Sequence, residues 1–184
     1  MAPKATKKAA TPTKAPAKGA SQKYEYVDLN KVSLTSTEHH HVYGVIIDAT
    51  FPHKVNADKY VCSLKIIDPS LHQKGNKSGD NDFATVVIYA KRFEDLPICQ
   101  KVGDIIRLHR ATLRMWKNQR QFNLSTHWNG SWALFNSEDA SYNPISWNGK
   151  RATFEKHENV LLSSLRKWTK EHFSSHDGVT KDLY

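Results

Sequence analysis

The chain has 184 residues and a net charge of +9 at pH 7 (His neutral), which fits one domain of ordinary size with some length left for tails. Its two cysteines, Cys62 and Cys99, exclude a disulfide framework, fall short of a four-ligand zinc pattern and lie in apolar runs typical of packing. No stretch approaches the ~18 apolar residues of a membrane span, and no apolar signal sequence begins the chain. We therefore expect no membrane partner and a reduced intracellular compartment.

Residues 1–23 form a Lys/Ala/Pro-rich tract that we expect to be disordered. Six of the 27 Lys and Arg residues lie in this tract without an acid, which leaves 21 against 18 Asp and Glu in the rest of the chain. The basic tract indicates a polyanionic partner and favours the nucleus or a chromosome. A solvated leader without a role in recognition stays an open alternative.

Three strands are predicted in the first half of the chain. Residues 41–50 and 59–68 are rich in β-branched and aromatic side chains, and the proline and polar residues of 51–58 predict a loop between them. Two glycines and mixed charge make 69–82 a long loop, and a third strand follows at 83–91.

Two further strands are predicted at 105–116 and 120–128, with residues 116–119 as a tight connection. Within the fourth strand the apolar residues change from even to odd positions, so a bulge near His109–Arg110 is needed to keep them all on the core. The bulge leaves a second set of side chains on the opposite face: Arg107, Arg110, Thr112, Arg114 and Trp116.

Five β segments with a short helical turn between the third and fourth are the order of an all-β OB-fold, a five-stranded Greek-key barrel. The helical turn is expected within 92–104. Strand count alone leaves an SH3-like barrel open, but the long fourth and fifth strands with their tight connection favour the OB-fold. We expect the barrel to occupy residues 24–140.

The pattern changes to an amphipathic helix at 154–175, after a linker at 141–153 and before a tail at 176–184. Its apolar stripe consists of Leu161, Leu165, Trp168 and His172. The stripe must cover the barrel, a following domain or a partner chain.

The stretch 110–128 combines cations, rings and amides in a pattern that fits single-stranded nucleic acid. Cations pair with phosphates, rings stack on bases at ~1–3 kcal/mol each, and amides bond to base edges. Alternation places Trp116 outside, whereas Phe122 and Trp128 share the parity of the core. The other candidates are Arg110, Arg114, Lys117, Gln119, Arg120 and Gln121, with Tyr89 and Lys91 from the third strand and His53 and Lys54 from the loop before the second.

No pattern of catalytic residues or phosphate-binding glycines stands out, so we expect neither an enzyme nor a cofactor. The tract His39-His40-His41 and the pair His172 and His176 have metal-like spacing but no third ligand of clear identity. We therefore expect no metal site.

Four segments carry a family resemblance: residues 43–70, 84–123, 131–136 and 165–168. They closely resemble the first OB-fold of the ciliate telomere end-binding protein alpha subunits and, more loosely, the protection-of-telomeres proteins. The resemblance implies binding of the G-rich single-stranded 3′ overhang at chromosome ends, with capping as the outcome.

The resemblance also implies roles for particular residues. Trp116 and Trp128 stand where the family has rings that stack on DNA, and Tyr89 matches a ring position on the third strand. Lys54 stands where the family has a positively charged residue. His53 stands where the family has a tyrosine, so the resemblance supports base stacking at position 53 less strongly.

The alpha subunits of the family continue into a second DNA-binding OB-fold and a third that contacts a beta subunit. This chain ends at Tyr184, so we expect it to hold half of a DNA groove. The helix at 154–175 resembles the connector to the second OB-fold. Its stripe is then expected to be exposed and to permit a homodimer.

The leading hypothesis is a telomeric single-stranded DNA-binding domain. Two alternatives stay open: a protein-interaction OB domain without DNA binding, and a sequence-tolerant single-strand binder of the replication type.

Overall fold

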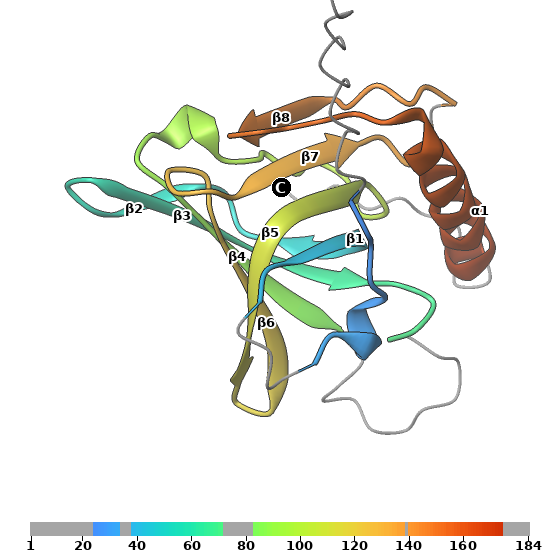
Figure 1. Cartoon of the computed structure of the whole chain (residues 1–184), viewed down its shortest axis with the longest axis horizontal. Coiled ribbons are helices and arrows are strands. Elements are labelled where there is room, and N and C mark those ends of the chain that lie inside the picture. Colours follow the sequence, from blue (N-terminus) through green and yellow to red (C-terminus); the bar gives the residue numbers. More distant parts are fainter. Residues whose placement is uncertain (1–23, 34–37, 72–82, 139, 175–184) are drawn as a thin grey trace, which may run out of the picture.

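Five strands of the chain close into a barrel in the computed structural model, which describes residues 24–33, 38–71, 83–138 and 140–174. They are β1 (His40–Ala49), β3 (Lys59–Ile67), β4 (Ala84–Ala90), β5 (Ile105–Trp116) and β6 (Gln119–Ser125). The sheet runs in the order β1-β3-β4-β6-β5, and β5 pairs again with β1 to close it (Figure 1). All these pairings are antiparallel except β4 with β6. The predicted OB-fold is confirmed.

The predicted strand boundaries agree closely with the structure except at one end. The fourth predicted strand has the bounds of β5, whereas the fifth was expected to reach residue 128 and β6 ends at Ser125. The helical turn expected before β5 is the 3-10 helix η2 (Phe93–Asp95), and another short 3-10 helix, η1 (Leu29–Lys31), precedes β1. The loop expected at 69–82 and the tails at 1–23 and 176–184 lie wholly or mostly outside the described residues.

Three strands extend the barrel beyond the predicted five. The short β2 (His53–Asn56) pairs with β3 inside the segment expected to be a loop. On the other side β7 (Ser131–Phe135) pairs with β5, and β8 (Ser146–Gly149) pairs with β7. Part of the segment expected to be a linker thus belongs to the sheet.

The predicted bulge in β5 is confirmed. Two steps along β1, from His40 to Val42, face three steps along β5, from Ala111 to Leu108. Arg110 takes up the extra residue with a φ of 60°, in the left-handed region. Because of this extra residue, apolar side chains on both sides of the slip enter one core, which includes Ile106, Leu108, Ala111, Leu113, Ile66, Ile88 and Phe122.

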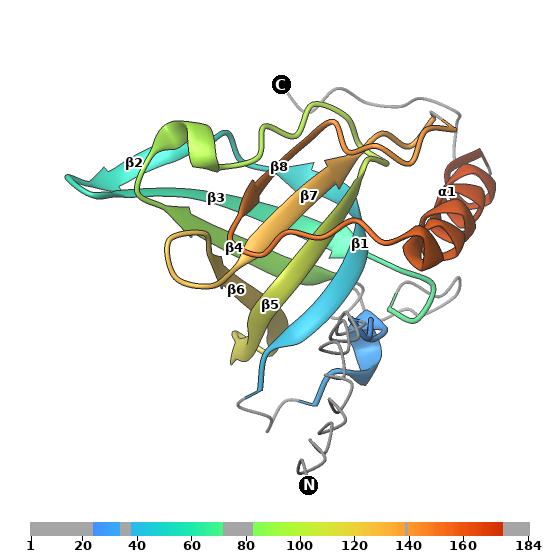
Figure 2. The ribbon, with the colours of Figure 1, turned by 45° about the horizontal axis from the view of Figure 1, so that its top comes forward.

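The C-terminal helix packs against the outside of the barrel (Figures 1 and 2). The 3-10 helix η3 (Lys156–Glu158) leads into α1 (Asn159–Ser174), which starts later than the predicted 154. Glu155 and Glu158 form a capping box that satisfies backbone N–H groups at the start of η3. No helix among the described residues is long and apolar enough to cross a membrane.

The apolar side of α1 covers the barrel, so the expectation of an exposed stripe is wrong. Leu162 and Leu165 are buried in a second cluster with Tyr43, Ile105 and Phe135 of the sheet. His172 is buried and Trp168 is half-buried, whereas Leu161 lies at the exposed edge. Of the three coverings considered for the stripe, the barrel is the one observed.

Candidate nucleic-acid interface

The outer face of β3, β4, β6 and the end of β5 carries rows of mainly polar side chains. Strand pairing fixes which side chains lie in line across it, because directly paired residues project from the same side of a sheet. One row joins Val61, Tyr89 and Ser125. Two further rows consist of Ser63, Val87, Asn123 and Thr112, and of Lys65, Thr85, Gln121 and Arg114.

Trp116 stands at one end of this face, at the tip of the β5–β6 hairpin. The turn has two central residues, Lys117 and Asn118, with φ of 49° and 62°, as in the tight turns that match the twist of a hairpin. The Trp116 side chain is 62% exposed and Lys117 Nζ lies 5.9 Å from the centre of its ring. Its partner in the ladder is Gln119, so a ring, a cation and an amide lie together.

Trp128 stands beyond the other end of β6, in a turn at 126–129. The Trp128 side chain is 76% exposed and lines a hollow of about 180 Å³ together with Tyr89, Asn123 and Ser125. The alternation that placed this ring inside does not apply, because β6 ends at Ser125. Phe122, within the strand, is fully buried as predicted.

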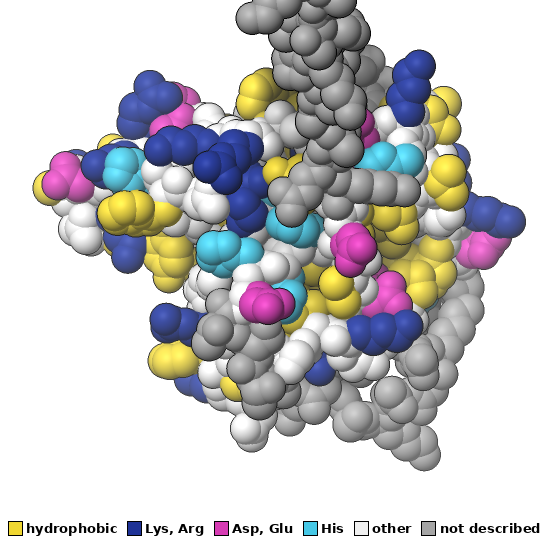
Figure 3. Space-filling model, in the orientation of Figure 1, with side chains coloured by type: hydrophobic (Ala, Val, Ile, Leu, Met, Phe, Trp, Pro, Cys, Tyr) yellow, Lys and Arg dark blue, Asp and Glu magenta, His cyan; other side chains and the backbone are white. Residues whose placement is uncertain are grey.

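The other predicted loop contributes an exposed edge to the same face. His53 and Lys54 are exposed on β2, where His53 pairs with Val61 in the row that contains Tyr89. Tyr89 is half-buried, with Lys59 Nζ at 4.3 Å from its ring centre. Lys91 is exposed directly after β4. Figure 3 shows Lys and Arg side chains gathered over β2 and the neighbouring η2.

Comparison with known proteins shows to which family the chain belongs. Residues 20–178 match the family model described as "Telomeric single stranded DNA binding POT1/CDC13". The chain belongs to this family. The resemblance found in the sequence is therefore confirmed.

Two relatives and one solved structure of this telomeric family illustrate the similarity. The chain is 49% identical over 197 residues to the telomere-binding protein subunit alpha of Stylonychia mytilus, covering 97% of this chain and 40% of that protein. It is 50% identical over 195 residues to the same subunit of Sterkiella nova, with 97% and 39% covered. The crystal structure of fission yeast Pot1 with single-stranded DNA has a similar fold, with a TM-score of 0.59, 17% identity and 78% and 46% covered. The chain thus spans about two fifths of the length of these ciliate relatives.

Three arginines are engaged within the protein: Arg107 and Arg110, which were predicted on the open face, and Arg120, which was predicted only as a DNA-binding candidate. Arg110 donates from Nε to Asn129 O, from Nη1 to Tyr24 Oη and from Nη2 to Lys150 O, each at 2.5 Å. Arg120 projects from the opposite side of β6 to Gln121 and donates to Val32 O at 2.9 Å. Arg107 is covered by η3 and pairs with Glu158 at 3.2 Å. Periodicity within a strand indicates the side of the sheet from which a side chain projects, but not which other segments cover that side chain.

Arg114, Lys117, Gln119 and Gln121 do lie together near Trp116. Arg114 pairs with Gln121 across the β5–β6 ladder, and Arg114 and Lys117 are exposed. Gln121 Nε2 donates to Asn123 Oδ1 at 2.9 Å, which orients the amide along the face. Arg92, next to Lys91, is instead held by a bidentate ion pair with Asp95.

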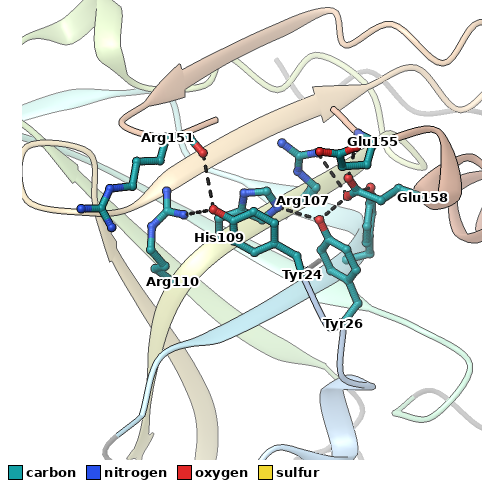
Figure 4. Close-up of polar contacts among 9 residues, drawn as sticks. Tyr24, Tyr26, Arg107, His109, Arg110, Arg151, Glu155 and Glu158 are labelled. Atoms are coloured by element: carbon teal, nitrogen blue, oxygen red, sulfur yellow. Dashed lines mark hydrogen bonds and ion pairs between the residues drawn. The ribbon is translucent and has the colours of Figure 1, made fainter. Parts of the chain in front are cut away.

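The sequence prediction missed the segment that precedes η1. Tyr26 forms a parallel bridge with His41, and Tyr24 stacks on His109 with 4.1 Å between ring centres and 8° between planes (Figure 4). Burial, and next the charge of Arg107, lower the pKa of His109 from about 6.5 to about 2, so its ring is neutral. The alternating tyrosines of residues 24–26 are the signal that could have identified this short extended segment.

The histidine tracts do not form a metal centre in the described part of the chain, where no group of three metal-ligating side chains lies close enough. His176 lies outside the described residues. His41 Nδ1 accepts from the Arg110 N–H at 3.0 Å, and burial, followed by the charge of Arg110, lowers the pKa of His41 to about 4. His41 is therefore a neutral acceptor that supports the bulge.

Proposed function

We propose that this chain binds the G-rich single-stranded DNA of chromosome ends through the polar face of its barrel, in the nucleus. The observation that carries the proposal is a pair of exposed indoles, Trp116 and Trp128, at the two ends of β6. The seven residues of β6 span roughly 20 Å, which suits several nucleotides of an extended strand. The names of the relatives, telomere-binding proteins, support the same ligand.

Each kind of side chain on the face has a distinct part in binding. Trp116 and Trp128 stack on bases, each at ~1–3 kcal/mol, and exposed rings lose little internal packing when they do so. Amides of Gln119 and Gln121 bond to base edges. Phosphates are held by Lys54, Lys91, Arg114 and Lys117, with Tyr89 and His53 as further contacts along the row between β2 and β4.

The action on DNA is binding without catalysis, and the outcome is protection of the chromosome end. The description of the family, which names DNA binding and no reaction, supports this proposal. A single strand covered by stacked rings and paired phosphates is withdrawn from other proteins that act on single strands.

Two protein partners also belong to the proposal. A beta subunit, which the family resemblance implies, would associate through parts of the alpha subunits outside the 40% of their length that aligns with this chain. A homodimer through α1 would use the exposed Val160 and Leu161, since Leu165 packs on the barrel. Size-exclusion chromatography with light scattering on this chain tests the homodimer directly, and a monomeric mass would rule it out.

The test of DNA binding is a fluorescence anisotropy titration. The probe is a labelled single strand of about 16 nucleotides with alternating runs of T and G, in lithium chloride to disfavour guanine quadruplexes. Trp116→Ala and Trp128→Ala should each weaken binding about tenfold or more, because each removes one stacked base. Trp147→Ala is the matched control, because Trp147 is also exposed but lies on β8, outside the proposed face.

The outcomes separate the proposal from its alternatives. Absence of binding at tens of micromolar would contradict DNA binding and favour a protein-interaction domain. A scrambled strand of the same composition that competes equally would indicate a sequence-tolerant binder. Unchanged affinity in both variants, with folds intact, would remove the indoles from the site.

A further inference from the structure

In the turn that carries Trp128, Thr126 is buried, whereas His127 and Trp128 are exposed. Two backbone hydrogen bonds hold its ends, from Thr126 N to Tyr89 O at 3.1 Å and from Gly130 N to Ser125 O at 2.9 Å. The indole between these ends is largely exposed. Its ring contacts the ring of His127 in the same turn, with 5.2 Å between centres, so the direction in which the indole projects depends on what holds the backbone of residues 127–129.

We infer that Arg110 is a positioning residue that fixes the turn bearing Trp128, rather than a phosphate contact. Its Nε donates to the carbonyl oxygen of Asn129, the residue directly after Trp128. This inference rests on the proposed function, because its consequence is the stacking of Trp128 on a base.

The guanidinium of Arg110 is anchored on two other segments. Nη1 donates to Tyr24 Oη in the segment before η1, and Nη2 donates to Lys150 O after β8 (Figure 4). A planar guanidinium presents its donors in a rigid fork, so three acceptors on three segments fix its orientation. Asn129 is thus tied through one side chain to two parts of the chain far from it in sequence.

The backbone of Arg110, from which this guanidinium extends, is itself held by the bulge and by neighbouring rings. Its φ of 60° belongs to the bulge, and its N–H donates to His41 Nδ1 at 3.0 Å. Tyr24 is in turn stacked on His109, and His109 Nε2 lies 2.6 Å from Tyr26 Oη. Arg110 therefore extends from a bulge braced by aromatic rings, which is the support that a positioning residue needs.

The position of Arg110 also distinguishes it from the exposed cations. Arg110 is half-buried and lines both the Trp128 hollow and a larger one of about 680 Å³ beside His39, His40 and His41. Arg114, four residues later, is exposed on the outer face. The two arginines are expected to respond differently when each is replaced.

The first experiment is a double-mutant cycle on DNA affinity. Arg110→Asn removes the guanidinium but tolerates the left-handed backbone. With the T/G-run strand as probe, it should weaken binding about fivefold in the wild-type background but less than twofold in Trp128→Ala, since the ring it positions is already gone. Arg114→Gln is the matched control and should have the same effect in both backgrounds.

Salt dependence provides a second readout. Loss of one phosphate contact on a single strand lowers the slope of log affinity against log salt by about 0.7. Arg114→Gln should show that decrease, and Arg110→Asn should keep the wild-type slope. Tyr24→Phe keeps all charges and removes one acceptor, so it should weaken binding in the same direction by a smaller factor.

A third readout needs no DNA. In the free protein, the ¹⁵N heteronuclear NOE of the Trp128 indole and of the Asn129 amide should fall in Arg110→Asn and stay unchanged in Arg114→Gln. Thermal melting monitors the fold of each variant. Tyr24→Phe replaces Arg110→Asn in the cycle if the latter does not fold.

The results that overturn the inference differ from those that overturn the proposed function. Suppose that Trp128→Ala weakens binding, but that Arg110→Asn has the same effect in both backgrounds and also reduces the salt slope. Arg110 would then be a phosphate contact. An unchanged NOE would show that Arg110 does not hold the turn. If the wild-type chain does not bind, or Trp128→Ala binds as tightly as wild type, the proposed function of the indole fails and the inference fails with it.

Discussion

Replacement of Glu158 by glutamine should destabilise the domain more than any change on the proposed DNA face. The Glu158 and Arg107 side chains are only 4% and 2% exposed, and they form an ion pair at 3.2 Å. Glu158 also accepts from Tyr26 Oη, from Tyr43 Oη at 3.0 Å and from Glu155 N at 3.1 Å (Figure 4). One carboxylate thus joins the N-terminal segment, β1, β5 and the start of η3.

The size of the effect follows from the charge that remains. In Glu158→Gln the guanidinium of Arg107 is buried without a counter-ion, which costs about 3–5 kcal/mol for pairs of this kind. The ring of Phe154 lies 4.6 Å from the guanidinium carbon and offsets a part of that cost. We expect a loss of about 3 kcal/mol in the free energy of unfolding, a large share of the ~5–15 kcal/mol typical of a domain.

Urea unfolding at pH 7, followed by far-ultraviolet circular dichroism, measures this loss. Glu155→Gln is the control, because it removes a charge from the capping box and leaves the ion pair; it should cost less than about 1 kcal/mol, since the amide oxygen can still accept the backbone N–H. The double variant Arg107→Met with Glu158→Leu should recover only the part of the loss that comes from the buried charge, since Tyr43 Oη and Glu155 N still lose their acceptor. A Glu158→Gln protein within about 0.5 kcal/mol of wild type would show that the buried Arg107 guanidinium does not depend on this counter-ion.

Three further predictions concern pH, salt and thiol chemistry. Because the pKa of His109 is about 2 and that of His41 about 4, both protonate near pH 6.5 only after unfolding, so stability should fall as pH drops below 6.5. For His109 alone, the free energy of unfolding should fall by about 1.4 kcal/mol per pH unit below pH 6.5. Urea unfolding of His109→Gln at several pH values should therefore show a shallower dependence of this free energy on pH. Equal slopes in the variant and the wild type would contradict a low pKa for His109. Arg114→Ala should reduce the salt slope of DNA binding by about 0.7, whereas Lys156→Ala, on η3, should not change it. Burial raises the pKa of the Cys62 thiol to about 12, so neither Cys62 nor the equally buried Cys99 should react with Ellman's reagent before unfolding; fast reaction in native buffer would contradict the packing.

The barrel was predictable because its signals are local. Strand alternation, the tight connection at Lys117–Asn118 and the phase slip at Arg110 each depend on a few neighbouring residues. The slip in particular predicted the bulge, although not the left-handed backbone of Arg110. The ends of the strands were harder to predict from the sequence. Trp128 continues the alternation of β6, although the hydrogen-bonded pairing of this strand stops at Ser125.

The sites that were misjudged depend on contacts between distant segments. Arg107 and Arg110 have the parity of an open face, but η3 covers the first and Tyr24, Asn129 and Lys150 bind the second. No periodicity within one strand contains this information. β8 was missed for the same reason, because its four residues gain their place by pairing with β7.

An NMR titration of the indole N–H groups would observe directly the proposed contact of Trp116 and Trp128 with single-stranded DNA. The chain has five tryptophans; Trp132 is buried and donates to Asp95 O at 2.9 Å, Trp147 lies on β8 and Trp168 on α1. On addition of the T/G-run strand, the indole signals of Trp116 and Trp128 should shift strongly and the other three should stay near their free positions. Shifts confined to Trp147 or Trp168, or no shift of any indole at saturating DNA, would exclude the proposed interface.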